Sequence, residues 1–266
     1  MLIDAFAEGW IEHLNECATA LHSSSCLYLL IDGAFIPGLH KSLPPDRKAL
    51  LFASLPGCSE VSKDASPLLV AYERDDKQRK ALLQRCTRWP MLSAIETPES
   101  LYRLAARLAA WCVVEADGQC FNFRFPDTRR LPAIFKALTL QQRAAFTGPM
   151  KRWSYMSRDG RWMDLPVEGE GDDGVADPVL DERQFASLVD DGRADELLVL
   201  LRDRGHDVFG SPSRSHALLT IALRAALVAG LDEDDVFPWC EWSWKHDQLH
   251  DDTDPASLLQ SWRKES

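Results

Sequence analysis

A turn signal between two strand-like segments places the tightest limit on the fold of this chain. Asp117-Gly118 separates residues 111–115, which are apolar up to Glu115, from residues 120–125, in which aromatic side chains alternate with others. Asp-Gly between two such segments is typical of a two-residue β-hairpin, because both turn residues must adopt positive φ angles. One face of the second strand then carries the aromatic side chains and is expected to be buried. These side chains are Phe121, Phe123 and Phe125.

Strands and helices are expected on both sides of this hairpin, throughout residues 1–165. Apolar runs predict strands at 26–31, 68–72 and 91–95, and Asp159-Gly160 predicts a second hairpin that joins 151–157 to 161–165. Apolar residues at helical spacing predict helices at 3–21, 75–88, 129–138 and 140–146, and Thr97 with Pro98 is expected to open another. This order predicts a mixed β-sheet with packed helices in an N-terminal lobe.

Residues 179–266 are expected to form an all-helical C-terminal lobe, so the predicted fold class is α+β. Leucine-rich stretches predict one helix around 185–189, a second around 197–201 that stops at Gly205, and a third that Ser213 caps and that runs to Gly230. Asp232 is expected to open a fourth helix, and a short last helix holds Leu258 and Trp262.

The two lobes differ in charge and are separated by a segment rich in glycine and acid. The net charge is −11, and residues 166–266 hold 23 acidic against 9 basic side chains, while residues 1–165 hold 18 acidic against 21 basic ones. The segment from Glu168 to Gly174 consists only of Glu, Asp and Gly, which is typical of a solvated linker. The predicted domains are therefore 1–165 and 179–266, joined by a linker at 166–178.

Composition argues against membrane and nucleic-acid partners. No apolar run approaches the ~20 residues that span a bilayer, and the first eight residues carry acid where a secretory signal needs basic side chains. We therefore expect a cytoplasmic protein. An acidic chain is a poor general binder of nucleic acid, although the arginines of the first lobe leave a nucleic-acid face as one alternative. These arginines are Arg124, Arg129, Arg130, Arg143, Arg152, Arg158 and Arg161.

Sequence motifs for catalysis are sparse, and we predict no enzyme activity, no cofactor and no bound metal. The seven cysteines include no Cys-x-x-Cys pair, and none stands beside a histidine in the sequence, so they are expected to be reduced core residues. His246 and His250 have the i, i+4 spacing of zinc proteases, with Asp251 or Asp254 as a third ligand. Asp247 replaces the glutamate that would act as general base. A metal-dependent hydrolase that uses this histidine pair is the alternative function.

Tryptophan is the most unusual feature of the composition. The chain contains nine, and three of them follow Phe237 within a few residues, at Trp239, Trp242 and Trp244. On a helix, the first two share a face and the third lies well around from both. At least one is therefore expected to be exposed as a partner-binding anchor or to pack the lobes together.

Several segments resemble the bacterial type VI secretion effector chaperones, also called adaptors (TEC or Tap). The resemblance begins at Leu27-Tyr28-Leu29-Leu30-Ile31-Asp32-Gly33-Ala34 and continues in order through 51–53, 66–70 and the helix after Thr97-Pro98. It includes Phe123-Arg124-Phe125 and residues 140–149, and covers about residues 26–165. Arg124 matches the family pattern, whereas Pro126-Asp127-Thr128-Arg129 stands where members often have aromatic-Asp-Pro-Arg.

The resemblance implies a non-enzymatic protein that binds a toxic effector and helps load it onto the VgrG spike, often through a PAAR-type module. The expected partners are a secreted toxin and a VgrG/PAAR-type spike protein, with this chain as a monomer in the complex. The expected partner-binding residues are Phe237, Trp239, Trp242, Trp244 and Arg124.

Overall fold

The structure is a computed structural model that describes residues 2–74, 77–167, 178–246 and 255–265. The chain divides into two compact units. We call Ala5–Leu188 the mixed unit, and Met1–Asp4 together with Val189–Ser266 the helical unit. Each is described by itself. The predicted linker at 166–178 lies largely outside the described residues and stays a prediction.

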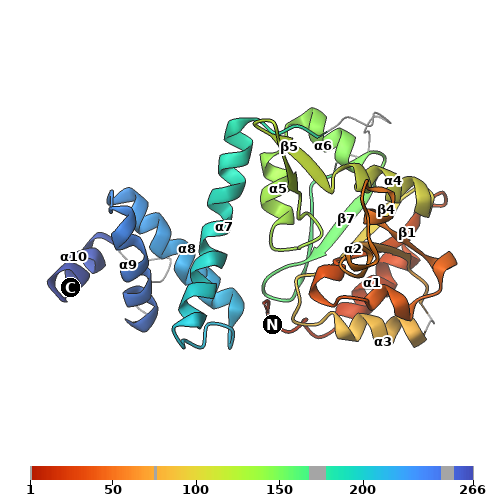
Figure 1. The fold of residues 1–266 in the computed structure, drawn as a ribbon. Coiled ribbons are helices and arrows are strands. Elements are labelled where there is room, and N and C mark those ends of the chain that lie inside the picture. The colour runs from red at the N-terminus through yellow and green to blue at the C-terminus, as the bar shows by residue number, and fades with distance from the viewer. Residues whose placement is uncertain (1, 75–76, 168–177, 247–254, 266) are drawn as a thin grey trace. The chain divides into compact units, whose positions relative to one another are not determined.

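A six-stranded sheet forms the centre of the mixed unit, and β1, β4 and β7 lie side by side within it (Figure 1). The order is β2-β3-β1-β4-β7-β8, with bounds β1 Cys26–Ile31, β2 Lys48–Leu50, β3 Leu68–Ala71, β4 Leu92–Thr97, β7 Arg152–Met156 and β8 Trp162–Asp164. The α+β class is confirmed. Every neighbouring pair in this sheet is antiparallel, so in this detail it differs from the mixed sheet that the alternation of strands and helices suggested.

Strand β1 is buried on both faces, which explains its unbroken apolar sequence. Tyr28 and Leu30 belong to the large core that includes residues of helices α4 (Leu101–Ala110), α5 (Leu131–Ala137) and α6 (Leu140–Thr147). Leu29, on the opposite face, is equally inaccessible to solvent, and helix α1 (Trp10–Thr19) packs against this strand. A strand that is covered on both faces needs apolar side chains at every position, so its sequence is a continuous apolar run.

The predicted hairpin at Asp117-Gly118 is confirmed, but it forms a sheet of its own. Strands β5 (Val113–Ala116) and β6 (Gln119–Asn122) pair with each other, and the two turn residues have φ angles of 49° and 70°, as a type I′ turn requires. Residues 178–180 lie along the outer side of β5, where the Glu115 amide donates to the carbonyl of Pro178 at 2.9 Å. The Leu180 amide donates to the carbonyl of Glu115 at 2.8 Å.

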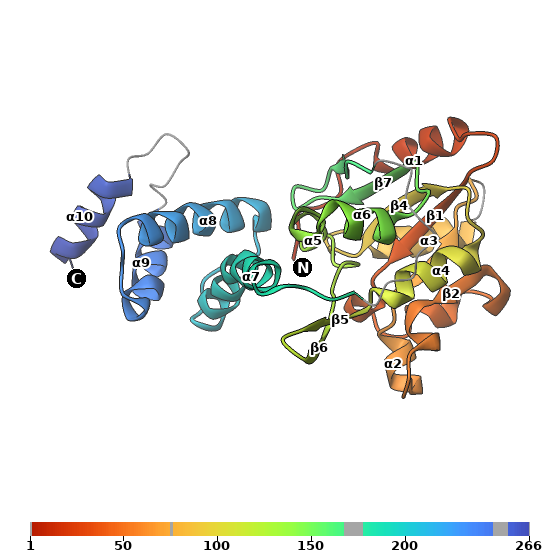
Figure 2. The ribbon, with the colours of Figure 1, turned by 90° about the horizontal axis from the view of Figure 1, so that it is seen from above.

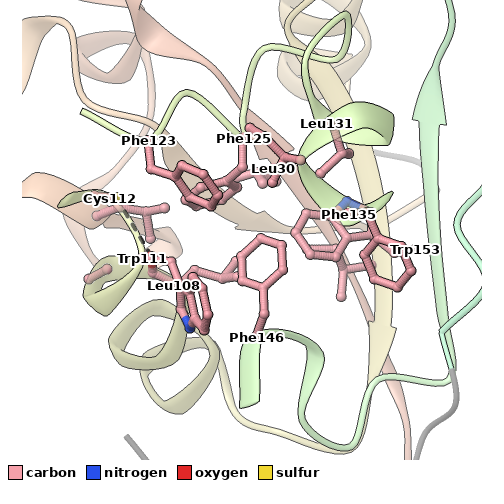
Figure 3. Packing of buried hydrophobic residues seen from close by; sticks show 14 of the residues in the cluster. Leu30, Leu108, Trp111, Cys112, Phe123, Phe125, Leu131, Phe135, Phe146 and Trp153 are labelled. Atoms are coloured by element: carbon pink, nitrogen blue, oxygen red, sulfur yellow. Dashed lines mark hydrogen bonds between the residues drawn. The ribbon is translucent and has the colours of Figure 1, made fainter. Parts of the chain in front are cut away.

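The aromatic face of the hairpin enters the core (Figure 3). Phe123 and Phe125 are buried, and the ring of Phe125 meets Phe146 edge to face at 5.2 Å between centroids. Trp153 packs against Phe146 at 5.1 Å, and its indole N–H donates to the Ser93 hydroxyl at 3.1 Å. The expectation that these phenylalanines are buried is therefore confirmed for Phe123 and Phe125, while Phe121 is half-buried against Phe185.

Two helix starts differ from the sequence-based expectation. Helix α1 begins at Trp10 rather than at residue 3, because Gly9 precedes it with a left-handed φ of 81°. Helix α4 begins at Leu101, and Ser100 is its N-cap, with its hydroxyl accepting from the Arg103 amide. Thr97 instead ends β4, where the register pairs it with Cys26. The remaining helices of this unit are α2 Glu60–Asp64 and α3 Lys77–Arg85, with short 3-10 helices η1 Gly33–Phe35, η2 Leu39–Ser42, η3 Pro45–Arg47 and η4 Leu51–Ser54.

Among the described residues, the regular secondary structure of the helical unit is α-helical, and its first helix, α7 (Glu182–Asp203), begins before Val189 in the residues of the mixed unit. Helix α7 is one long helix where two were expected, because Gly192 stands within it without breaking the helical backbone. Helix α8 (Pro212–Val228) is preceded by Ser211 rather than by Ser213, with Pro212 at its first position. Helices α9 (Glu233–His246) and α10 (Pro255–Glu265) follow (Figures 1 and 2). None of the described helices is both long and apolar enough to cross a membrane.

Candidate functional site

A cavity of about 200 Å³ lies in the mixed unit beside the end of β1. Its walls are mostly apolar, and its polar groups come from Asp32, Asn122 and Arg124. The cavity brings together residues from the end of β1, the loop before β3 and the segment that follows β6. Its other lining residues are Ala34, Phe52, Ala65, Pro67, Cys112, Phe123 and Pro126.

Asp32 is the buried charged group of this cavity. It follows β1 directly and caps η1, with its Oδ1 accepting from the Ala34 amide at 3.0 Å. Its Oδ2 accepts from Nη2 of Arg124 at 2.8 Å. Burial raises the pKa of Asp32, and the guanidinium of Arg124 and the Ala34 amide oppose that shift. Since both carboxylate oxygens are engaged, this group is better suited to hold Arg124 in place than to accept a proton from a substrate.

Arg124 is partly exposed, with 42% of its side-chain surface accessible. It stands between Phe123 and Phe125, whose side chains enter the core, so alternation along the chain directs it to the opposite side. The guanidinium also lies over the ring of Phe35, 5.7 Å from its centroid. Among the residues that the structure describes, its Nε and Nη1 have no hydrogen-bond partner. An arginine has five N–H donors, so Arg124 can still bind a carboxylate or carbonyl group.

Gly33 allows the backbone to pass tightly beside this site. A Cβ atom built on Gly33 would lie 2.3 Å from the carbonyl oxygen of Ser66. No side chain fits at that distance without displacing backbone, so the Asp32-Gly33 pair is a packing requirement as well as a cap.

A second arginine–aspartate pair lies on the same aromatic ring. Arg129 donates to both oxygens of Asp127, at 3.1 and 2.7 Å, and its guanidinium lies 5.9 Å from the centroid of Phe35. Trp89 packs against Phe35 at 5.9 Å. Asp127 is almost fully buried, so in this chain it supports the loop that follows Arg124. Phe35 is thus held between two arginines and a tryptophan.

A cysteine–histidine contact was missed in the sequence because the two residues are separated along a helix. His13 and Cys17 are four residues apart on α1, and Nε2 of His13 lies 3.6 Å from Sγ of Cys17. Nη1 of Arg152 lies 3.1 Å from the same sulfur. The i, i+4 spacing on a helix was the available signal for this contact. Cys17 is nevertheless buried.

The predicted tryptophan anchors of the helical unit occupy different environments. Trp239 is fully buried, and its indole N–H donates to the carbonyl of Ala222 at 2.9 Å. It stacks on Trp242 at 5.7 Å and meets Trp262 edge to face at 5.8 Å. Trp239 is therefore a core residue, and an anchor role for it would require the unit to open. Trp242 and Trp244 are half-buried at the edge of the same core.

Phe237 is also half-buried, and the guanidinium of Arg204 covers its ring at 4.5 Å. Arg204 in turn donates to Glu241 at 3.1 Å. Glu241 accepts from His206 at 2.9 Å and lies 3.4 Å from Lys245. These contacts lower the pKa of Glu241, the hydrogen bond from His206 most of all.

The histidine pair proposed as a metal site falls partly outside the described residues, which end at His246 and resume at Pro255. Nδ1 of His246 lies 2.9 Å from the carbonyl oxygen of Trp242, and the ring stacks on Trp242 at 4.3 Å. Within residues 2–74, 77–167, 178–246 and 255–265, no three metal-ligating side chains gather into a possible metal site.

The arginines that made nucleic-acid binding an alternative function have diverse partners within the chain. Arg124 and Arg129 bind aspartates, Arg152 contacts Cys17, and Arg161 pairs with Asp159. Arg143 donates to the carbonyl of Lys136 and lies over the ring of Phe135. Many arginines of the first lobe are therefore engaged in contacts within the chain.

Comparison with protein families gives one match that contains the whole cavity. Residues 27–145 match the family described as Domain of unknown function (DUF4123), a domain known in type VI secretion effector adaptor proteins. The match begins at the second residue of β1, ends within α6 and includes every residue that lines the cavity beside Asp32. Comparison with curated proteins and with solved structures gives no match. This chain is therefore similar to DUF4123 proteins over the segment that builds the candidate site.

Proposed function

We propose that this chain is a non-enzymatic adaptor that binds a type VI secretion toxin in the cytoplasm and helps load it onto a VgrG/PAAR-type spike. The observation that carries the proposal is the DUF4123 match over residues 27–145. The matched segment contains most of the buried core residues of the mixed unit and the whole Asp32–Arg124 cavity.

The site geometry is more compatible with binding than with turnover. Asp32 and Asp127 are both buried and both paired with arginine, so neither is poised as a general base. The unused donors of Arg124 and the apolar cavity walls offer what a peptide needs: hydrogen bonding at the rim and room for an apolar side chain.

The helical unit supplies a second candidate surface for the partner. It is acidic, and Trp242 and Trp244 stand half-buried at the edge of its core. Complementary charge would speed the encounter with a basic toxin segment, and a partly exposed tryptophan can contribute a large share of the binding free energy. We assign these two tryptophans and Phe237, rather than Trp239, to the partner-binding surface.

The proposal is tested by purifying the chain with the toxin and spike candidates encoded beside its gene. We expect the chain and the toxin to elute together in size-exclusion chromatography and to bind the spike protein as a complex. Trp242→Ala and Trp244→Ala should weaken the complex while leaving the chain folded, and exposed Val199→Ala is the matched control. Separate elution of all three purified proteins would contradict the adaptor function.

A further inference from the structure

Strand β6 has an open edge. In an antiparallel pair, residues alternate between those that bond to the neighbouring strand and those whose N–H and C=O point away from it. The Phe123 amide donates to the carbonyl of Cys112 at 2.9 Å. From that pair, the β5–β6 register makes Phe121 an inward-bonding residue and directs the backbone groups of Cys120 and Asn122 outward.

The other strand of the hairpin confirms this alternation. Glu115 lies opposite Cys120, and its own N–H and C=O bond outward to Pro178 and Leu180. The outer side of β5 is thus covered by residues 178–180. On β6, the outward N–H and C=O groups of Cys120 and Asn122 have no hydrogen-bond partner among the described residues.

This four-residue edge lacks the charged side chains and proline that normally discourage strand addition. Natural edge strands are shortened, or carry lysine, proline or charge. The edge strands of the large sheet follow that rule: β2 is three residues long, begins with Lys48 and follows Pro45, and β8 is three residues long and ends with Asp164. Strand β6 has the sequence Gln-Cys-Phe-Asn, without charge or proline, and Cys120 and Asn122 are exposed.

The open edge leads directly into the cavity. Asn122, the last residue of β6, lines the cavity together with Phe123 and Arg124. A strand that pairs with β6 advances about 3.4 Å per residue, so its next one or two residues reach the cavity mouth. There it meets apolar walls and the two unpartnered nitrogens of Arg124.

We propose that β6 is a docking edge, which receives an extended segment of the protein partner as an added strand. This inference rests on the proposed function, because the strand comes from the toxin that the adaptor binds. The backbone of the segment bonds to Cys120 and Asn122, an apolar side chain fills the cavity, and a neighbouring carboxylate binds Arg124. Main-chain bonds supply affinity in such strand addition, and the side-chain pocket supplies selectivity.

The test uses a library of short random peptides displayed on phage and selected on the full chain. We expect the selected peptides to share an apolar residue next to aspartate, glutamate or a free C-terminus. Cys120→Pro, which removes an outward N–H, and Arg124→Gln should each weaken binding of a synthetic selected peptide at least about tenfold. Val113→Ala, on the covered neighbouring strand, is the control and should leave binding within about twofold.

Hydrogen exchange of the unaltered chain gives a second readout that needs no variant. Peptide binding should slow exchange at the Cys120 and Asn122 amides, and should change the Phe121 amide little because it already bonds to β5. Peptides that do not slow exchange at these two amides, or a selection that yields no binder, would overturn the docking edge. A dimer of the chain that Cys120→Pro dissociates would overturn it in favour of a second copy as the occupant.

The two proposals fail separately. If the toxin co-purifies with the chain but Cys120→Pro and Arg124→Gln bind it normally, the docking edge is wrong and the adaptor function stands. If selected peptides bind the edge but neither candidate partner binds the chain, the adaptor function is wrong and the edge stands.

Discussion

Arg124 and Asp32 are 92 residues apart in the chain, and Nη2 of the arginine donates to the buried carboxylate of the aspartate at 2.8 Å. The contact ties the segment after the β5–β6 hairpin to the end of β1, so it fixes the geometry of the cavity between them. Burial raises the pKa of the Asp32 carboxyl group, and the positive charge of Arg124 opposes this rise.

Removing the arginine should destabilise the mixed unit in a pH-dependent way. Arg124→Gln leaves the Asp32 carboxylate buried without its cation, and we expect a loss of about 1–3 kcal/mol in the free energy of unfolding at neutral pH. The folded-state pKa of Asp32 should rise further in the variant, so the stability difference from the unaltered chain should shrink as pH falls and Asp32 becomes protonated in both proteins. Urea unfolding at several pH values measures this difference. The exposed Arg161→Gln is the control, and equal effects of the two substitutions would contradict the account.

The tight backbone approach at Gly33 should not tolerate a methyl group. Gly33→Ala would place Cβ 2.3 Å from the Ser66 carbonyl oxygen, and overpacking of this kind typically costs about 1–3 kcal/mol. Gly210→Ala is a matched control, because the nearest atom there is the side-chain Oδ2 of Asp207 at 3.0 Å, which can rotate away. Thermal unfolding of both variants compares them, and a melting temperature for Gly33→Ala at or above that of Gly210→Ala would refute the packing argument.

The tryptophans of α9 should separate into a core residue and surface residues. Trp239→Ala removes a fully buried ring and its hydrogen bond to Ala222, so we expect a loss of about 3–5 kcal/mol from the helical unit. Trp244→Ala, at the edge of that core, should cost less. Urea unfolding followed by far-ultraviolet circular dichroism tests the order, and a larger loss for Trp244→Ala would reverse the assignment.

Glu241 should make the helical unit sensitive to acid. Its pKa is lowered, chiefly by the hydrogen bond from His206 and also by Lys245 and Arg204. Because the pKa of Glu241 is lower in the folded than in the unfolded chain, its ionised form stabilises the fold. This stabilisation is fully present at pH values above the ordinary pKa of glutamate, and it is lost as pH falls through the folded-state pKa. In Glu241→Gln, the free energy of unfolding should therefore fall less steeply with decreasing pH than in the unaltered chain, as urea unfolding at several acidic pH values would measure. Glu196→Gln, at an exposed position on α7, is the control. If Glu241→Gln shows the same loss of stability at low pH as the unaltered chain, Glu241 is not the cause of the acid sensitivity.

Cysteine labelling should follow burial. The expectation that the cysteines are core residues is wrong for Cys26 and Cys120, which are exposed. Cys86, Cys112 and Cys240 are buried, and burial raises the pKa of each of these three thiols to about 12. Iodoacetamide at mildly alkaline pH should therefore label the exposed pair first and leave the other three unmodified until the chain unfolds. Peptide mass spectrometry at successive times gives the order. Early labelling of Cys112 would show that the cavity wall opens in solution.

The sequence predicted the local elements well where one residue pattern determines the backbone. Asp117-Gly118 specified its hairpin, and the apolar run at 26–31 matches β1 in both bounds. Helix boundaries were less predictable, because Thr97-Pro98 and Ser100 both carry capping signals and only the pairing of β4 with β1 decides between them. Helix α7 was predicted as two helices, around 185–189 and 197–201, whereas the structure has one continuous helix through both.

The candidate site was only partly predictable. Arg124 could be singled out, but its partner Asp32 lies 92 residues away and is brought to it only by the fold. The contact between His13 and Cys17 follows from helical spacing, whereas the third member, Arg152, comes from a distant strand. Among the tryptophans, composition indicated an excess, but packing with Trp262 decided that Trp239 is internal.

The proposed adaptor function is that this chain delivers one toxin by binding it. Its most direct test is a delivery assay in the bacterium that encodes the chain, which compares cells with the gene deleted, restored, and restored with Arg124→Gln. The account predicts that deletion abolishes delivery of the neighbouring toxin while the spike protein is still secreted, that the restored gene recovers delivery, and that Arg124→Gln recovers it only in part. Undiminished toxin delivery from the deletion strain would contradict the account.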